Sequence, residues 1–198
     1  SNPGEPHWKA MKHLLRYLKG FPDLSLVYRV CDSSDFGLFR FSDLEWANDL
    51  DNRRSTSGYS FKLSKNSGVV CWGSRKQQTV ALSSCEAEYI AMSSAAQELV
   101  FLRGLLFDLG VNDNTVYADS PLLLYGDNQG AIALATNPIA HKRTKHINIR
   151  HHYLRELVEA KTLQLRCGLT ANNLADVLTK NLPKDPFNVF RNRLFRVL

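Results

Sequence analysis

Residues 83–89 read Ser83-Ser-Cys-Glu-Ala-Glu-Tyr89 and open the stretch that decides the fold. Serine is a favoured helix N-cap, so either of the first two residues predicts the start of a helix that runs to about Leu109, where Gly110 ends it. Steps of three and four residues from Glu88 reach only apolar or small side chains: Met92, Ala95, Leu99, Leu102 and Leu106. This stripe predicts the face that packs on a sheet. Glu86 lies about 200° further round the helix and leads a more polar face, which favours Glu88 as the inward-pointing acid.

Three short strands are predicted before that helix. The run from Leu38 to Asp43 reads as the first strand, with Asp43 and Glu45 on the same face as its phenylalanines. The runs 59–63 and 69–72 flank Lys65-Asn-Ser-Gly68, which is a hairpin signal. Strands joined by such short turns predict an antiparallel meander.

The elements after the helix continue the α/β pattern. Pro121-Leu-Leu-Leu-Tyr125 is a short apolar run, typical of a buried strand, and Asp127 follows its carboxyl end, where ligands of open α/β sheets bind. Helices are expected at 128–135 and 147–160, and a last strand at 163–169. The final helix is predicted to open at Asn172 or Asn173 and to carry Asp176 in its first turn. The chain therefore predicts an α/β domain with a mixed five-stranded sheet, three antiparallel strands followed by two parallel ones, flanked by helices.

The first 34 residues read as an appendage to that domain. Residues 7–19 form a basic amphipathic helix whose apolar side chains are interpreted as a packing face: Trp8, Met11, Leu14, Leu15 and Leu18. Gly20 and Pro22 end the helix, and Leu24 to Val30 alternates like a strand.

Bulk properties narrow the class of protein. The 198 residues carry a net charge of +6, with a pI near 9.2. A basic chain with an acidic cluster suits a partner rich in phosphates. The four cysteines form no CxxC pair and have no histidine at zinc spacing, which predicts reduced thiols. We expect no membrane span and no secretory signal, because no apolar run approaches ~20 residues and the N-terminus lacks the three-part signal layout.

Four acids stand where elements begin or end: Asp43, Glu88, Asp127 and Asp176. Carboxylates at element ends can converge in a cleft without burying charge in the core. Several carboxylates together are a natural site for Mg²⁺, which takes oxygen ligands. A single acid at an element end is usually a cap or a solvated carboxylate. Four in this order favour metal-dependent cleavage of a phosphodiester.

The order of elements and acids resembles that of the ribonuclease H fold, and short sequence motifs narrow the resemblance to one family. The motifs that carry it are Ser42-Asp-Leu-Glu-Trp-Ala-Asn-Asp49, Arg54-Ser-Thr-Ser-Gly-Tyr59, Ala81-Leu-Ser-Ser-Cys-Glu-Ala-Glu-Tyr89, Asp127-Asn-Gln-Gly-Ala-Ile132, Arg143-Thr-Lys-His-Ile-Asn-Ile-Arg150 and Leu174-Ala-Asp-Val-Leu-Thr-Lys180. They are similar to the ribonuclease H domain of copia-type LTR retrotransposon Pol polyproteins. His7-Trp-Lys-Ala with Leu15-Arg-Tyr-Leu-Lys-Gly20 resembles the end of the reverse transcriptase region upstream. The resemblance covers essentially the whole chain.

The resemblance implies a domain division and a mechanism. Residues 1–34 would be a stub of the reverse transcriptase or connection region, 35–183 the ribonuclease H domain and 184–198 a helical tail. The four acids would be the catalytic positions and would hold two Mg²⁺ ions, with Mn²⁺ as a substitute, one activating water and one stabilising the leaving 3′ oxygen. Asp43 would be the shared ligand, and Glu88 would orient the ribose 2′-hydroxyl or a water. The substrate would be the RNA strand of an RNA–DNA hybrid, cut during reverse transcription to 5′-phosphate and 3′-hydroxyl ends.

Nucleic-acid contacts are expected from basic and amide side chains. Those predicted to bind the hybrid are Arg53, Arg54, Arg75, Lys76, Asn128, Gln129, Lys142, Arg143, Lys145 and Arg150. The other implied partner is the polymerase region of the same polyprotein, in a cytoplasmic virus-like particle or in the nucleus, with no membrane and no small-molecule cofactor.

The chain departs from the family pattern at a few positions. Glu45 and Asn148 stand where the family usually has Asp, and Cys85 replaces a small hydroxyl residue. The loop 167–173 contains no histidine, which argues against a histidine proton shuttle there. None of these changes removes one of the four acids.

Three other interpretations were open. A DDE integrase or transposase would place its glutamate on a late helix, whereas here the glutamate comes second. A non-catalytic module that grips the hybrid is the alternative function. The histidines 141, 146, 151 and 152 could suggest a transition metal, but 146 and 151 lie five apart, poor spacing for one helix face.

Overall fold

The computed structural model describes residues 2–28, 36–49, 51–111, 121–137, 152–168 and 173–195. The strands in this part of the chain are β1 (Phe36–Glu45), β2 (Thr56–Ser64), β3 (Val69–Lys76), β4 (Leu122–Gly126) and β5 (Leu163–Cys167). The helices are α1 (Glu5–Gly20), α2 (Ser84–Asp108), α4 (Gln129–Thr136), α5 (His152–Glu159), α6 (Asp176–Thr179) and α7 (Lys184–Phe195). The predicted succession of elements is therefore reproduced, with ends that differ by a few residues.

One sheet joins the five strands in the order β3-β2-β1-β4-β5. β1, β2 and β3 pair antiparallel, while β1 with β4 and β4 with β5 pair parallel. Asp43 in β1 lies opposite Gly58 in β2, which in turn lies opposite Ser74 in β3. The predicted sheet of three antiparallel strands followed by two parallel ones is confirmed, and β1 is its central strand.

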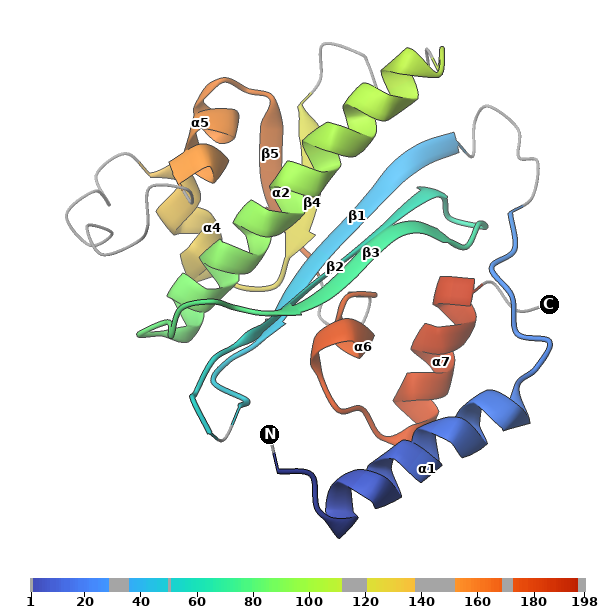
Figure 1. Ribbon diagram of the computed structural model, residues 1–198. Helices are drawn as coiled ribbons and strands as arrows, with labels where there is room; N and C mark the ends of the chain where they lie inside the picture. Colours follow the sequence, from blue (N-terminus) through green and yellow to red (C-terminus); the bar gives the residue numbers. More distant parts are fainter. Residues whose placement is uncertain are drawn as a thin grey trace.

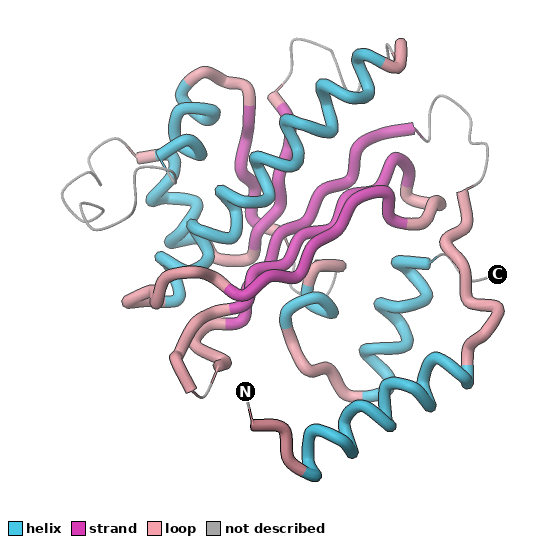
Figure 2. The backbone as a smooth tube through the Cα atoms, viewed as in Figure 1, coloured by secondary structure: helices cyan, strands magenta, loops and turns pink. Residues whose placement is uncertain are grey.

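Helices cover both faces of this sheet. Figure 1 shows α2, α4 and α5 on one face, and α6 with α7 on the other; the tube in Figure 2 shows the same layers around the strands. The larger core lies under α2, where Phe61, Met92, Leu99 and Leu124 are fully buried. A smaller cluster under α7 contains Val69, Leu174, Phe190 and Leu194. Burial of each such side chain stabilises the fold by roughly 1.5–3 kcal/mol.

The long helix α2 is the element that the sequence predicts best. Ser83 is its N-cap and accepts a hydrogen bond from the Glu86 N–H at 3.1 Å. The apolar stripe headed by Glu88 is buried along its length, because it packs on β1 and β2. By length and composition alone α2 also passes as a membrane span, but half of that segment is buried in the protein. A core helix of a globular domain explains both observations.

The last helix and the segment 24–28 differ from expectation. The final helix is the short α6, which begins at Asp176 and not at Asn172 or Asn173, and the predicted helical tail 184–198 is α7. Pro183 separates the two, because it lacks an N–H and restricts its neighbour to extended backbone. Residues 24–28 form no strand; Val27 pairs its backbone with Phe195 and Gly68 instead. The predicted domain boundaries stay a prediction.

The apolar face of α1 does not pack on the sheet. Trp8, Met11, Leu14, Leu15 and Leu18 are each at least half exposed, so the predicted packing face lies open in this part of the chain. The contact of α1 with the domain runs through Tyr17, whose ring centroid lies 5.8 Å from that of Phe187 in α7.

Gly58 makes the close approach of α6 to β2 possible. A Cβ at this position would lie 2.6 Å from Cγ2 of Thr179 and 3.1 Å from Cβ of Leu178. We expect Gly58→Ala to lower the free energy of unfolding by about 1–3 kcal/mol, the usual cost of overpacking, in urea denaturation. Gly104→Ala is the control, because nothing lies within 4 Å of its Cβ and alanine favours the helix by roughly 0.5–1 kcal/mol. Equal stability of the two variants would contradict this packing.

Candidate active site

Asp43 lies in the central strand, on the face that α6 covers. Its side chain is almost fully buried, at 1% exposure. The Thr179 hydroxyl donates to Oδ2 of Asp43, and Lys180 Nζ donates to Oδ1 at 3.0 Å. The carboxylate is therefore held from both sides by the end of α6.

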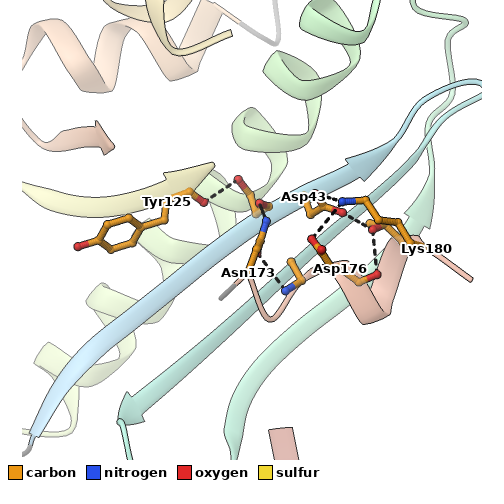
Figure 3. A network of polar contacts seen from close by, with 8 residues as sticks. Asp43, Tyr125, Asn173, Asp176 and Lys180 are labelled. Atoms are coloured by element: carbon orange, nitrogen blue, oxygen red, sulfur yellow. Dashed lines mark hydrogen bonds and ion pairs between the residues drawn. The ribbon is translucent and has the colours of Figure 1, made fainter. Parts of the chain in front are cut away.

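Asp176 joins Asp43 through the same lysine. Lys180 Nζ lies 3.1 Å from Oδ1 of Asp176, and the two residues are spaced i,i+4. Figure 3 shows the ammonium between the two carboxylates, with α6 and β1 supplying the three side chains. β1 and α6, which lie far apart in the sequence, thus bring two of the predicted acids to the ammonium of Lys180.

Glu88 approaches the same region from the other side, on the second turn of α2. It is 2% exposed, and its Oε1 is a buried atom without a hydrogen-bond partner. A Cβ at Gly126, the last residue of β4, would lie 3.3 Å from Oε1 and 3.2 Å from Sδ of Met92. Glycine at this strand end therefore leaves room for the Glu88 carboxylate.

Asp127 follows directly after β4 and is half-buried. The next residue, Asn128, caps α4 by accepting a hydrogen bond from the Ala131 N–H at 3.0 Å, which fixes the turn that carries Asp127. The charge of Asp127 raises the pKa of both Glu88 and Asp176. Asp127 therefore belongs to the same electrostatic cluster.

The four acids share an excess of negative charge. Burial, together with the charges of Asp43 and Asp127, raises the pKa of Glu88 to about 9. Burial also raises the pKa of Asp43 to about 7, although the hydrogen bond from Thr179 and the charge of Lys180 oppose it. The pKa of Asp176 is raised by burial in the same way. Burial lowers the pKa of Lys180, but the two aspartates outweigh it and leave that pKa raised.

Asn173 fixes the segment that enters α6. Its amide Nδ2 donates to the Ser42 carbonyl at 2.9 Å, and its Oδ1 accepts from the Ala175 N–H. Ser42 in turn donates its hydroxyl to the Tyr125 carbonyl at 3.3 Å, which connects β1 to β4 (Figure 3). The prediction that Asn173 opens the helix is wrong, since α6 begins at Asp176 with Ala175 as N-cap. It anchors the segment to the central strand instead.

All four acids were predicted from the sequence, but the roles of three residues around them were not: Thr179, Lys180 and Asn173. The available signal was the i,i+4 spacing of Asp176 and Lys180, which puts a cation on the same helix face as a predicted metal ligand. The neighbouring acids have other roles. Glu45 accepts from the Asn48 amide at 2.9 Å. Glu86, expected on a polar face, is buried and accepts from the Leu82 N–H, at the start of α2.

The predicted nucleic-acid contacts fall into two groups. Arg53, Arg75, Lys76 and Gln129 are exposed, Arg54 and Asn128 are half-buried, and Lys76 pairs with Asp49. Lys142, Arg143, Lys145 and Arg150 lie outside the described residues, as do Cys31, His141, His146, His151 and Asn148. Lys180, which was not among the predicted contacts, pairs with two of the four acids.

The residues fit a divalent cation by their chemistry. In the part of the chain that the structure describes, no three His, Cys, Asp or Glu side chains lie at metal-binding spacing. The Asp43 carboxylate is bound by Lys180 and Thr179 instead. A buried carboxylate oxygen without a partner, raised pKa values and an ammonium between two acids all indicate a site that needs positive charge.

Comparison with known proteins gives sequence relatives over nearly the whole chain. No protein-family profile matches. The retrovirus-related Pol polyprotein from transposon TNT 1-94 of Nicotiana tabacum is 39% identical over 188 residues, 95% of this chain and 13% of that protein. The corresponding polyprotein from transposon RE2 of Arabidopsis thaliana is 36% identical over 97% of this chain and 13% of that protein. The secreted RxLR effector protein 161 of Plasmopara viticola is 49% identical over 52% of this chain and 69% of its own length.

A solved structure is similar at a lower level. The N-terminal ribonuclease H domain of a Mycobacterium tuberculosis protein, fused to maltose-binding protein, aligns with a TM-score of 0.42 and 12% identity over 76% of this chain and 94% of that chain.

The sheet order, its strand directions and the placement of the helices define a ribonuclease H-like domain. The homologues that match over nearly the whole chain are Pol polyproteins of copia-type retrotransposons, and the chain spans about an eighth of the length of the two transposon polyproteins.

Proposed function

We propose that the chain is a metal-dependent ribonuclease H that cuts the RNA strand of RNA–DNA hybrids during reverse transcription of a retrotransposon. The observation that carries the proposal is the pairing of the buried Asp43 and Asp176 carboxylates through Lys180, with Glu88 and Asp127 near enough for charge to act between them. A fold alone does not give an activity. A cluster of buried acids whose pKa values are strongly raised is a functional-site signal in its own right.

Mg²⁺ ions, or Mn²⁺ in their place, would be held by the four carboxylates, with Asp43 as the shared ligand. When bound, such ions supply Lewis-acid activation of a water and stabilise charge on the leaving oxygen. In the overall reaction water adds to phosphorus, the bond to the 3′ oxygen breaks, and that oxygen takes up a proton. The products are a 5′-phosphate and a 3′-hydroxyl.

The protein's own contribution is position and charge. Thr179 and Asn173 hold the segment that presents Asp176 against the central strand, so the carboxylates are placed before substrate binds. Glu88 has a free acceptor oxygen, and it would accept a hydrogen bond from a ribose 2′-hydroxyl. That group distinguishes RNA from DNA, which gives a basis for choosing the RNA strand.

The hybrid would be gripped through its phosphates. The exposed Arg53, Arg75 and Lys76, with Arg54 and the basic residues of 142–150, would supply phosphate contacts without reading sequence. Asn128 and Gln129, beside Asp127, would reach the minor groove. The polymerase region of the same polyprotein is the proposed partner, in a cytoplasmic particle or in the nucleus.

Cleavage of an end-labelled RNA strand tests the proposal. The strand is offered alone, in an RNA duplex and in an RNA–DNA hybrid, with Mg²⁺, Mn²⁺ or EDTA. We expect cutting of the hybrid only, and none in EDTA. Equal cutting of all three substrates, or cutting in EDTA, would overturn the proposal. Binding of the hybrid without cutting, even after the polymerase region is supplied in trans, would identify a non-catalytic module instead.

A further inference from the structure

Lys180 stands where a cation would bind the two aspartates. Its Nζ lies 3.0 Å from Oδ1 of Asp43 and 3.1 Å from Oδ1 of Asp176. The side chains of Asp43 and Asp176 are 1% and 9% exposed, so water does little to screen the repulsion between their carboxylates. Without the ammonium, two buried carboxylates would face each other uncompensated.

The backbone of Lys180 is fixed while its side chain is accessible. It is the C-cap of α6, with extended backbone at φ −106° and ψ 144°, and its N–H donates to the Asp176 carbonyl at 2.8 Å. The side chain is 30% exposed. An ammonium on a flexible four-carbon stem can therefore leave the two carboxylates for solvent without any movement of α6.

We propose that Lys180 is a positioning residue, a resident counter-cation that holds Asp43 and Asp176 together and leaves when a divalent cation binds them. This inference rests on the proposed metal-dependent function. A divalent cation and an ammonium cannot share the same two oxygens, because they repel each other at that distance. The lysine thus keeps the acids assembled in the absence of metal and competes with the metal for them.

The competition has a consequence that a purely structural role does not have. Removal of a structural contact loosens a site and weakens its ligand. Removal of a competing cation leaves the carboxylates with more negative charge and tightens metal binding. The metal must displace two charge-assisted hydrogen bonds of Lys180, and the partial exposure of that side chain limits what they contribute. We expect a gain in Mg²⁺ affinity of about tenfold.

Titration calorimetry with Mg²⁺ on Lys180→Met, Lys180→Arg and wild type tests the inference. Lys180→Met should bind Mg²⁺ about tenfold more tightly than wild type, since methionine keeps the length of the stem and loses the charge. Lys180→Arg should stay close to wild type. Lys184→Met, an exposed lysine at the start of α7, removes the same charge and should change the dissociation constant by less than about twofold. Equal or weaker binding by Lys180→Met would overturn the inference.

Thermal denaturation in EDTA gives a second readout that needs no metal. Lys180→Met should melt below wild type, and this loss should shrink in the Asp43→Asn background, because the two residues interact directly. An unchanged loss in that background would contradict the counter-cation role. Failure of the proposed function has a different signature: hybrid cleavage is absent in wild type, while the shifts in melting temperature and in Mg²⁺ affinity still occur.

Discussion

Asp43→Asn should lose cleavage of the RNA strand by more than about a hundredfold while binding of the hybrid is retained. Even outer partners of metal ligands cost 10–100-fold when changed, and Asp43 is the proposed shared ligand itself. Asparagine has the same shape, so its one oxygen can still accept from Lys180 while its amide NH2 donates to the Thr179 hydroxyl. Phosphate contacts elsewhere should leave the affinity for the hybrid within a few-fold of wild type. The measurement is single-turnover cleavage beside filter binding on the same protein.

Glu45→Gln is the matched control for that variant. Glu45 ends the same strand but bonds to Asn48, away from Lys180. It should cleave at nearly the wild-type rate. If Asp43→Asn cleaved as fast as this control, the acid cluster would not be the active site, and the non-catalytic module would be the better interpretation.

The order of elements and the four acids were predictable because each depends on a local pattern. The stripe from Glu88 to Leu106 follows helical periodicity and is buried along its length, whereas residues 86–93 at the start of α2 are buried on every face, which the periodicity does not predict. The hairpin of β2 and β3 follows from the turn between them. The parallel pairing of β4 with β1 agrees with the short apolar run before Asp127.

The contacts of the supporting residues with the central strand were not predictable, since they span long sequence separations. Asn173 bonds a carbonyl 131 positions away, and Lys180 reaches an acid 137 positions away. Asparagine is favoured at helix N-caps, but at Asn173 tertiary contacts override that preference. The break before the helical tail 184–198 was visible in Pro183. That the end of α6 presents Lys180 to Asp43 required the fold.

Glu88→Gln should make the metal-free protein more stable at pH 8 than wild type and should reduce the fall of its stability with rising pH. The pKa of Glu88 rises from 4.5 to about 9 on folding. Between these values the folded state binds more protons than the unfolded state, so wild-type stability falls as pH rises through this window. One pKa unit corresponds to about 1.4 kcal/mol, which puts the effect on the order of several kcal/mol. The pKa of Asp43 rises from 3.8 to about 7 on folding. This residue therefore adds a smaller loss of stability, which is complete at a lower pH than that of Glu88.

Urea denaturation in EDTA at pH 5 and pH 8 measures this difference. Glutamine keeps the shape of the side chain and carries no charge at either pH. Between pH 5 and pH 8 the free energy of unfolding of the variant should therefore fall only by the contribution of Asp43. Glu156→Gln, an exposed acid of α5, should behave as wild type. Addition of Mg²⁺ should restore wild-type stability at pH 8 and do less for Glu88→Gln, because only the ionised carboxylate gains from the cation. A wild-type protein equally stable at both pH values would contradict the burial of this charge. The acids would then be solvated, and the strain that a bound metal relieves would be absent from this site.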